Sequence, residues 1–172
     1  MAGMCGSTTN WGGKPTNGSV SRNAGEVGLD TLYDWTQHSD PRIRYFSGTA
    51  IYKNSFTLKT SRKATYRLRL PLLNSVAEVI VNGQSAGIVW CSPWDIDITR
   101  QLRKGRNRVE IRVTNSLWNR LVGDARLPEQ ERITWQTTPL AKPDDRLLPS
   151  GLVGEVTINE YRQVKHLDVN KH

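Results

Sequence analysis

Two stretches of the chain alternate strictly between apolar and polar residues, and this pattern constrains the fold more than any other feature. In residues 64–70, three apolar residues from Tyr66 to Leu70 share one face, and arginines share the other. Residues 107–114 repeat the pattern, with valine and isoleucine against arginine and glutamate. A period of two is typical of a β-strand with one buried and one wetted face. The sequence therefore predicts a sheet with a charged outer surface.

Further strands are expected between turn signals along the chain. Asn82-Gly83 predicts a type I′ hairpin turn, because both central residues of that turn need positive φ. Gly105 is expected to reverse the chain in the left-handed region. The other predicted strands are residues 45–58, 76–81, 86–90, 95–98 and 151–161.

The length of 172 residues suits one domain. A (β/α)₈ barrel typically needs about 250 residues, so a barrel enzyme does not fit. Many short strands with almost no amphipathic helix indicate an all-β sandwich or jelly roll. We expect a flexible segment at 1–26, rich in Gly, Ser, Thr and Asn, the sandwich at 27–162, and a polar tail at 163–172.

The formal net charge of +8 restricts the partners only weakly. A basic surface attracts nucleic acid, anionic membranes or acidic polysaccharides. The lysines and arginines are scattered, which favours a solvated outer face, and no nucleic-acid motif is present. No apolar run reaches the 18 or so residues of a membrane helix. The two cysteines, Cys5 and Cys91, form neither a disulfide framework nor a zinc spacing, although a bridge between them stays open.

The stretch 76–114 carries a recognisable series of motifs. It contains Val81-Asn82-Gly83, a Pro-Trp corner at Trp94, and a second motif of Asp, Ile and Thr ending at Thr99. This series, with the early strand around 45–56, resembles the sugar-binding domain of glycoside hydrolase family 2, a galactose-binding-like jelly roll. Turn geometry explains most of these residues, so the motifs would also persist in a module without sugar affinity.

The flanking segments 119–128 and 149–154 resemble the terminal β-sandwich of large bacterial alpha-L-rhamnosidase-like hydrolases, and the resemblance covers about residues 33–161. It implies an extracellular or periplasmic glycan-degrading parent, with the catalytic domain of that parent as a partner. Jelly-roll sugar modules often hold one structural calcium ion. No cofactor is otherwise implied, and we assign no metal ligands.

Sugars bind proteins by stacking on aromatic rings while amides, carboxylates and arginine hold their hydroxyls. The long irregular stretch 115–150 contains such residues and is expected to be an ordered, functional loop. Arg120 and Asp124 lie four apart, so an ion pair that fixes this loop competes with a sugar clamp. Trp90 ends an apolar strand, which favours the core. The candidate ligand-binding residues are Trp94, Trp118, Asn119, Arg120, Asp124 and Trp135.

No catalytic residues are assigned, because glycosidases use two carboxylates at defined separations and no such pair stands out. The histidines are isolated, which gives neither a triad nor a metal spacing. The leading hypothesis is a non-catalytic domain, a fragment of a glycoside hydrolase, that binds plant-type or acidic polysaccharide. The alternative is a purely structural sandwich that packs against a missing catalytic barrel. Nucleic-acid binding driven by net charge is the third hypothesis.

Overall fold

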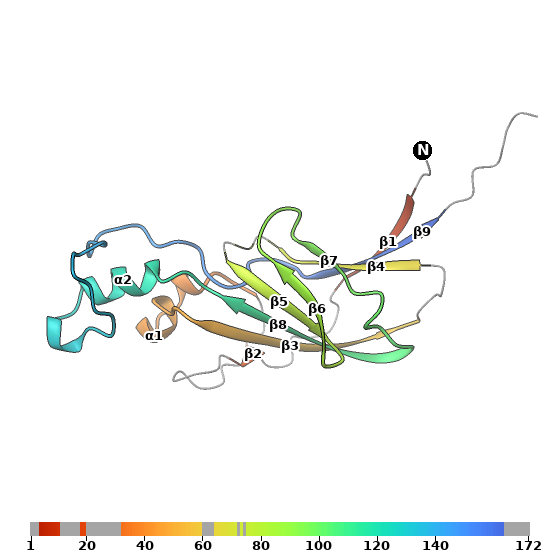
Figure 1. Cartoon of the computed structure of the whole chain (residues 1–172), viewed down its shortest axis with the longest axis horizontal. Helices are drawn as coiled ribbons and strands as arrows, with labels where there is room; N and C mark the ends of the chain where they lie inside the picture. Colours follow the sequence, from red (N-terminus) through yellow and green to blue (C-terminus); the bar gives the residue numbers. More distant parts are fainter. Residues whose placement is uncertain are drawn as a thin grey trace, which may run out of the picture.

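The computed structural model describes residues 4–10, 18–19, 32–59, 64–71, 73 and 75–163. These residues form a sandwich of two antiparallel sheets, which confirms the predicted all-β fold (Figure 1). One sheet has the strand order β1 (Met4–Asn10), β9 (Thr157–Gln163), β4 (Ala64–Arg69) and β7 (Asp95–Asp97). The other has the order β2 (Gly18–Ser19), β3 (Thr49–Leu58), β8 (Gly105–Thr114), β5 (Val76–Val81) and β6 (Gln84–Val89). The short helices are η1 (Trp35–Gln37), α1 (Pro41–Arg44), α2 (Trp118–Ala125) and η2 (Glu129–Glu131).

The core lies between the two sheets and follows the predicted alternation. Alternate residues of β4, β5 and β8 are buried, while their neighbours face water. Trp35 is buried in this core, where its ring stacks on Tyr52 at 5.9 Å and meets Phe46 edge-on at 5.7 Å. The Tyr52 hydroxyl accepts a hydrogen bond from the backbone of Leu152 at 3.1 Å, which ties β3 to the segment before β9.

The hairpin turn has the predicted geometry, with φ of 53° at Asn82 and 82° at Gly83. The Asn82 amide donates to the carbonyl of Gln101 and to Oδ1 of Asn107, both at 2.8 Å. Asn107 is buried, and it also bonds the backbone N–H and carbonyl of Arg103. These asparagines therefore hold neighbouring turns together, which fits the explanation of the sequence motifs by turn geometry.

Three parts of the structure differ from the sequence expectations. The stretch 115–150, expected to be irregular, begins with the helix α2, and β9 starts at Thr157 instead of residue 151. Trp90 is 69% exposed, so its assignment to the core was wrong. It follows Val89, which is buried, and alternation therefore turns the indole outward.

The strands β1 and β2 lie within the segment predicted to be flexible, and β1 pairs with β9 along its length. The remainder of residues 1–26 and the tail from residue 164 lie outside the described residues, so the predicted domain boundaries stay predictions. Cys91 is a free, exposed cysteine. Among the described residues, no helix is long and apolar enough to cross a membrane.

Candidate functional site

The helix α2 and the loop after it project beyond one end of the sandwich (Figure 1). The helix buries Leu121 and Val122 against Ala141, in a small apolar cluster separate from the main core. Gly123 permits this position, because a Cβ atom there would lie 2.7 Å from the side chain of Tyr45. The helix is therefore fixed between the sandwich and its own returning loop.

Two of the candidate residues on α2 hold the returning chain in place. The Trp118 indole N–H donates to the carbonyl of Arg146 at 2.9 Å. The Asn119 amide donates to the carbonyl of Leu148 and to the hydroxyl of Ser150, both at 2.7 Å, and its oxygen accepts from the N–H of Leu148 at 2.8 Å. Asn119 is 2% exposed, so its hydrogen bonds are made inside the protein.

Asp124 holds a second part of the loop. Its side chain is completely buried, and Oδ1 lies 2.8 Å from the Arg120 guanidinium, which forms the predicted i,i+4 ion pair. The other oxygen, Oδ2, accepts from the Thr134 hydroxyl at 2.6 Å, the Thr134 N–H at 2.7 Å and the Ile133 N–H at 3.2 Å. The carboxylate therefore joins α2 to the residue that precedes Trp135.

The ionisation of Asp124 follows from these contacts. Burial alone would raise the pKa of this carboxyl group. The hydrogen bonds from Thr134 and Ile133 and the charge of Arg120 outweigh burial, so the pKa lies below its usual value. Asp124 is therefore a carboxylate at neutral pH, and its negative charge strengthens the bonds that hold the loop.

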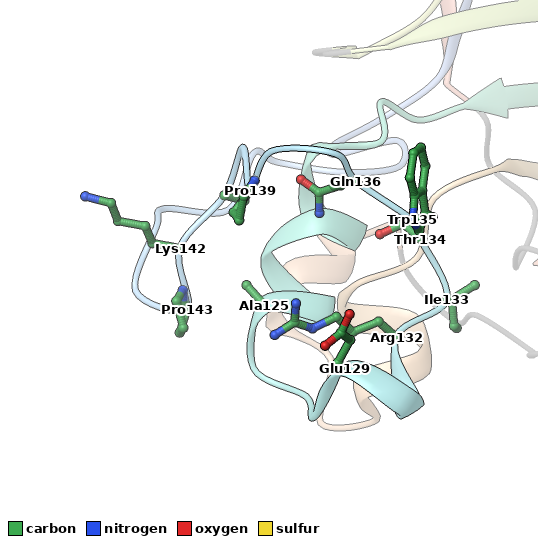
Figure 2. A pocket seen from close by; sticks show the side chains of 11 residues that line it. Ala125, Glu129, Arg132, Ile133, Thr134, Trp135, Gln136, Pro139, Lys142 and Pro143 are labelled. Carbon is green, nitrogen blue, oxygen red and sulfur yellow. The ribbon is translucent and has the colours of Figure 1, made fainter.

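An open pocket of about 560 Å³ lies between the end of α2 and the loop around Trp135. Figure 2 shows Glu129 and Arg132 beside one another in this pocket, with the Trp135 ring at one side and Lys142 at the other. The pocket is lined by Ala125, Glu129, Arg132, Ile133, Thr134, Trp135, Gln136, Pro139, Ala141, Lys142 and Pro143.

Trp135 is the most exposed large apolar residue at this pocket, at 84%. The chain on both sides of it is held, because Thr134 is bonded to Asp124 and the Gln136 side chain accepts from the N–H of Leu140 at 2.9 Å. An indole presented on a fixed loop, with an amide and charged groups nearby, offers a flat apolar surface and directional hydrogen bonds. Such convergence of apolar and polar groups is typical of ligand sites.

The structure separates the six candidate residues. Trp118, Asn119, Arg120 and Asp124 belong to the contacts that build the loop, and Trp135 belongs to the pocket wall. Trp94 lies elsewhere, partly buried against the main core. A sugar contact by any of them stays a prediction.

The sequence missed the pocket residues Glu129, Arg132 and Lys142. Their only signal was that they are charged and lie on either side of a loop tryptophan. The described residues contain no group of three or more histidine, cysteine, aspartate or glutamate side chains placed to hold a metal ion. The calcium ion therefore stays an untested prediction.

Known proteins share this structure as one part of longer chains. A rhamnosidase from Novosphingobium sp. PP1Y matches 93% of the chain at 33% identity and a TM-score of 0.74. A β-D-glucuronidase from Dictyoglomus thermophilum matches 91% of it at 18% identity and a TM-score of 0.65, which reports on the fold alone. By sequence, a "Putative beta-glucuronidase" from Formosa agariphila is 34% identical in an alignment of 160 residues that covers 78% of this chain.

No protein-family model matches the chain. The chain spans 14% of the Formosa agariphila protein, 14% of the Novosphingobium rhamnosidase and 28% of the Dictyoglomus glucuronidase. It is thus similar, over most of its length, to a small β-sandwich part of glycoside hydrolases.

Proposed function

We propose that this chain is a non-catalytic accessory domain of a glycoside hydrolase and that it binds carbohydrate at the Trp135 pocket. The observation that carries the proposal is the 84% exposed indole held on a fixed loop beside Gln136, Glu129 and Arg132. Its face would stack on a sugar ring, and the amide and charged groups would bond the hydroxyls.

The proposed parent is rhamnosidase-like, because the Novosphingobium rhamnosidase combines 33% identity with a match over nearly the whole chain. An extracellular or periplasmic enzyme acting on plant-type polysaccharide would suit that parent. The non-catalytic role is supported by the pocket itself. Glu129 is the only carboxylate among the described residues that line it, whereas glycosidases typically use two.

The experiment is a glycan-array screen of the chain, repeated at raised salt, with Trp135→Ala and Trp90→Ala as matched variants. Both indoles are largely exposed, at 84% and 69%, so neither substitution empties the core. We expect a salt-resistant hit that Trp135→Ala weakens and Trp90→Ala leaves unchanged. Trp118 would be a poor choice, because its indole bonds Arg146 and packs on the α2 cluster. A blank array, or equal loss in both variants, contradicts the proposal.

A second candidate, packing against a catalytic domain, is favoured by one observation. Apolar side chains are exposed on the same projecting segment, namely Leu117, Ile133, Leu140 and Leu148. Exposed apolar surface of this kind often marks an interaction site. If this role is correct, the glycan array stays blank, and a dye that fluoresces on apolar surface loses emission in Ile133→Ser with Leu140→Ser. The control variant combines Val76→Ser with Ile88→Ser, which replace exposed residues of β5 and β6.

A further inference from the structure

The outer face of the five-stranded sheet is divided into two halves with different charge balance. In the first half, Arg112 on β8 lies opposite Glu78 on β5. Its guanidinium donates to Glu110 at 2.7 Å and lies 3.6 Å from Glu78. This arginine has two carboxylate neighbours, so the positive charge in this half is compensated.

The second half has basic side chains that face hydroxyl groups. Arg106 and Arg108 lie two residues apart on β8 and therefore point to the same face. Their partners across the ladder on β3 are Thr57 and Ser55. The only polar contact of the Arg106 guanidinium within the described part of the chain is with the Ser55 hydroxyl, at 3.2 Å. No carboxylate faces either arginine across this ladder.

Lys53 is the third cation of this half. Its partner across the ladder is Glu110, whose carboxylate already accepts from Arg112. Between residues 32 and 163, leaving out the undescribed positions, the side chains of Lys53 and Arg108 make no ion pair or hydrogen bond. Two cationic groups on the same face of the sheet are therefore unpaired in this part of the chain.

These three cations line one open pocket of about 450 Å³, which we call the Arg108 pocket. Asn54, Ser55 and Gly83 also line it and add amide, hydroxyl and backbone groups. Glu110 lines it as well, but its carboxylate is bonded to Arg112, so three cations face one carboxylate that already has a partner. Gly83 contributes no side chain, and even an added Cβ would meet nothing within 4 Å, so this side of the pocket is open. The pocket combines positive charge with groups that bond hydroxyls.

Like charges share one exposed face here, and Glu110, opposite Lys53, offsets only part of their repulsion. Diagonal neighbours on adjacent antiparallel strands lie about 7–8 Å apart, so the Lys53 and Arg108 side chains repel one another on a shared face. A bound anion reduces this repulsion and gains charge-assisted hydrogen bonds from the two arginines. Arginine suits carboxylate and sulfate groups in particular, because its planar fork donates two parallel bonds.

We propose that the Arg108 pocket binds the anionic group, carboxylate or sulfate, of an acidic glycan. The choice of a glycan as the carrier rests on the proposed function. The lining residues support it, because Asn54 and Ser55 suit sugar hydroxyls, and none of the described lining residues is aromatic. Proteins that bind single-stranded nucleic acid typically stack its bases on aromatic side chains, which this pocket does not offer.

The test variant of the whole chain combines Lys53→Gln, Arg106→Gln and Arg108→Gln. These side chains point outward from β3 and β8, so the unfolding midpoint should stay unchanged. Binding of a galacturonate tetramer is measured by calorimetry. We expect at least about tenfold weaker binding in the variant, since bonds from charged groups are lost. If the variant fails to fold, chemical-shift changes at the Arg106 and Arg108 amides on titrating the natural chain give the same test.

The matched control combines Arg69→Gln, Arg100→Gln and Lys104→Gln, which are exposed positions outside the pocket. Both triple variants lower the formal net charge from +8 to +5, so they differ only in where the charge is removed. A methyl-esterified tetramer, which has no carboxylates, should not bind the Trp135→Ala variant, in which only the Arg108 pocket is left. A sulfated galactan oligomer of equal length distinguishes carboxylate from sulfate as the preferred group.

Equal weakening by both triple variants would overturn the proposal, because net charge alone would then explain the binding. Full binding of the methyl ester to the Trp135→Ala variant would overturn it too, as would tighter binding of a single-stranded DNA oligonucleotide through the same three residues. Trp135→Ala keeps the two proposals separate. If Trp135→Ala abolishes binding of neutral glycans but not of galacturonate, both sites exist. If galacturonate binding depends on the Arg108 pocket and no glycan binds through Trp135, the Arg108 proposal stands and the Trp135 proposal is wrong.

Discussion

Asp124→Ala should detach the loop that carries Trp135 from the helix α2. The substitution removes the partner of Arg120, whose side chain is only 16% exposed, and leaves three donors of Ile133 and Thr134 without their acceptor. Breaking a buried ion pair from one side costs about 3–5 kcal/mol. The loop can expose its freed donors to water, so we expect a cost at the lower end of this range. The free energy of unfolding should fall by about 3 kcal/mol.

A graded series separates the charge from the hydrogen bonds. Asp124→Asn keeps an acceptor oxygen, and we expect it to cost about half as much, since bonds to charged groups are worth about 1.5–3 kcal/mol and neutral bonds about 0.5–1.5 kcal/mol. Arg120→Met combined with Asp124→Ala should cost less than the two changes added together, because each single change leaves one charge unpaired whereas the double variant leaves none. Asp145→Ala is the control in the same segment, since its carboxylate accepts one exposed bond from the N–H of Lys142.

Urea unfolding followed by circular dichroism gives the free energies, and amide hydrogen exchange reports on Thr134 directly. We expect the Thr134 amide to exchange much faster in Asp124→Ala and at an unchanged rate in Asp145→Ala. A loss below about 1 kcal/mol with an unchanged Thr134 amide would refute the reasoning, because a buried pair must cost more when one partner is removed.

The other predictions concern backbone space, a buried amide and pH. Gly151→Ala should destabilise the fold by roughly 2–4 kcal/mol in urea unfolding, because φ at this residue is 81° and a Cβ would lie 2.6 Å from the Tyr52 hydroxyl. Gly83→Ala should cost only about 1–2 kcal/mol, because φ is similar, at 82°, but the space around a Cβ is open. Equal costs would show that the clash is absent. Asn107→Ala should cost about 2–4 kcal/mol, because it removes a buried amide that bonds Asn82 in one turn and both backbone groups of Arg103 in the next, and a near-neutral result would contradict that role. Because the pKa of Asp124 is depressed in the folded protein, its contribution is complete above the ordinary carboxylate range and is lost as pH falls below about 4. The protection of the Thr134 amide, which is its exchange rate relative to the intrinsic rate at the same pH, should therefore fall only in acid. In Asp124→Asn this change of protection with pH should disappear.

The strands could be predicted because each depends on a local pattern. Alternation fixed which residues of β4 and β8 are buried, and the positive φ of Asn82 follows from its place in a two-residue turn. The helix α2 had no such local signal. It is eight residues long and contains Gly123 and Asp124, both poor helix formers, so its stability comes from packing against Tyr45 and Ala141.

The candidate site was predictable in its location but not in the roles of its residues. Asn119 and Asp124 have the side chains expected of sugar ligands, yet their partners are Leu148, Ser150 and Thr134, which lie ten or more residues further along the chain. Nothing local in a sequence distinguishes a polar group that meets a ligand from one that meets a returning loop. The Arg108 pocket could not be predicted either. Its cations come together only because β3 pairs with β8, and burial of the core residues determines that pairing.

The internal hydrogen bonds of the loop bear directly on how strongly Trp135 can bind. Ordering a flexible aromatic side chain and its loop costs free energy that subtracts from affinity, and a loop already ordered avoids that cost. Thr134, immediately before Trp135, has two donors on the Asp124 carboxylate, and Gln136, immediately after it, closes onto Leu140. The buried residues therefore fix the position of the exposed indole. It follows that Asp124→Ala should weaken the binding of any ligand held by Trp135 without touching that ligand, whereas anion binding at the Arg108 pocket, on the outer face of the five-stranded sheet, should not change.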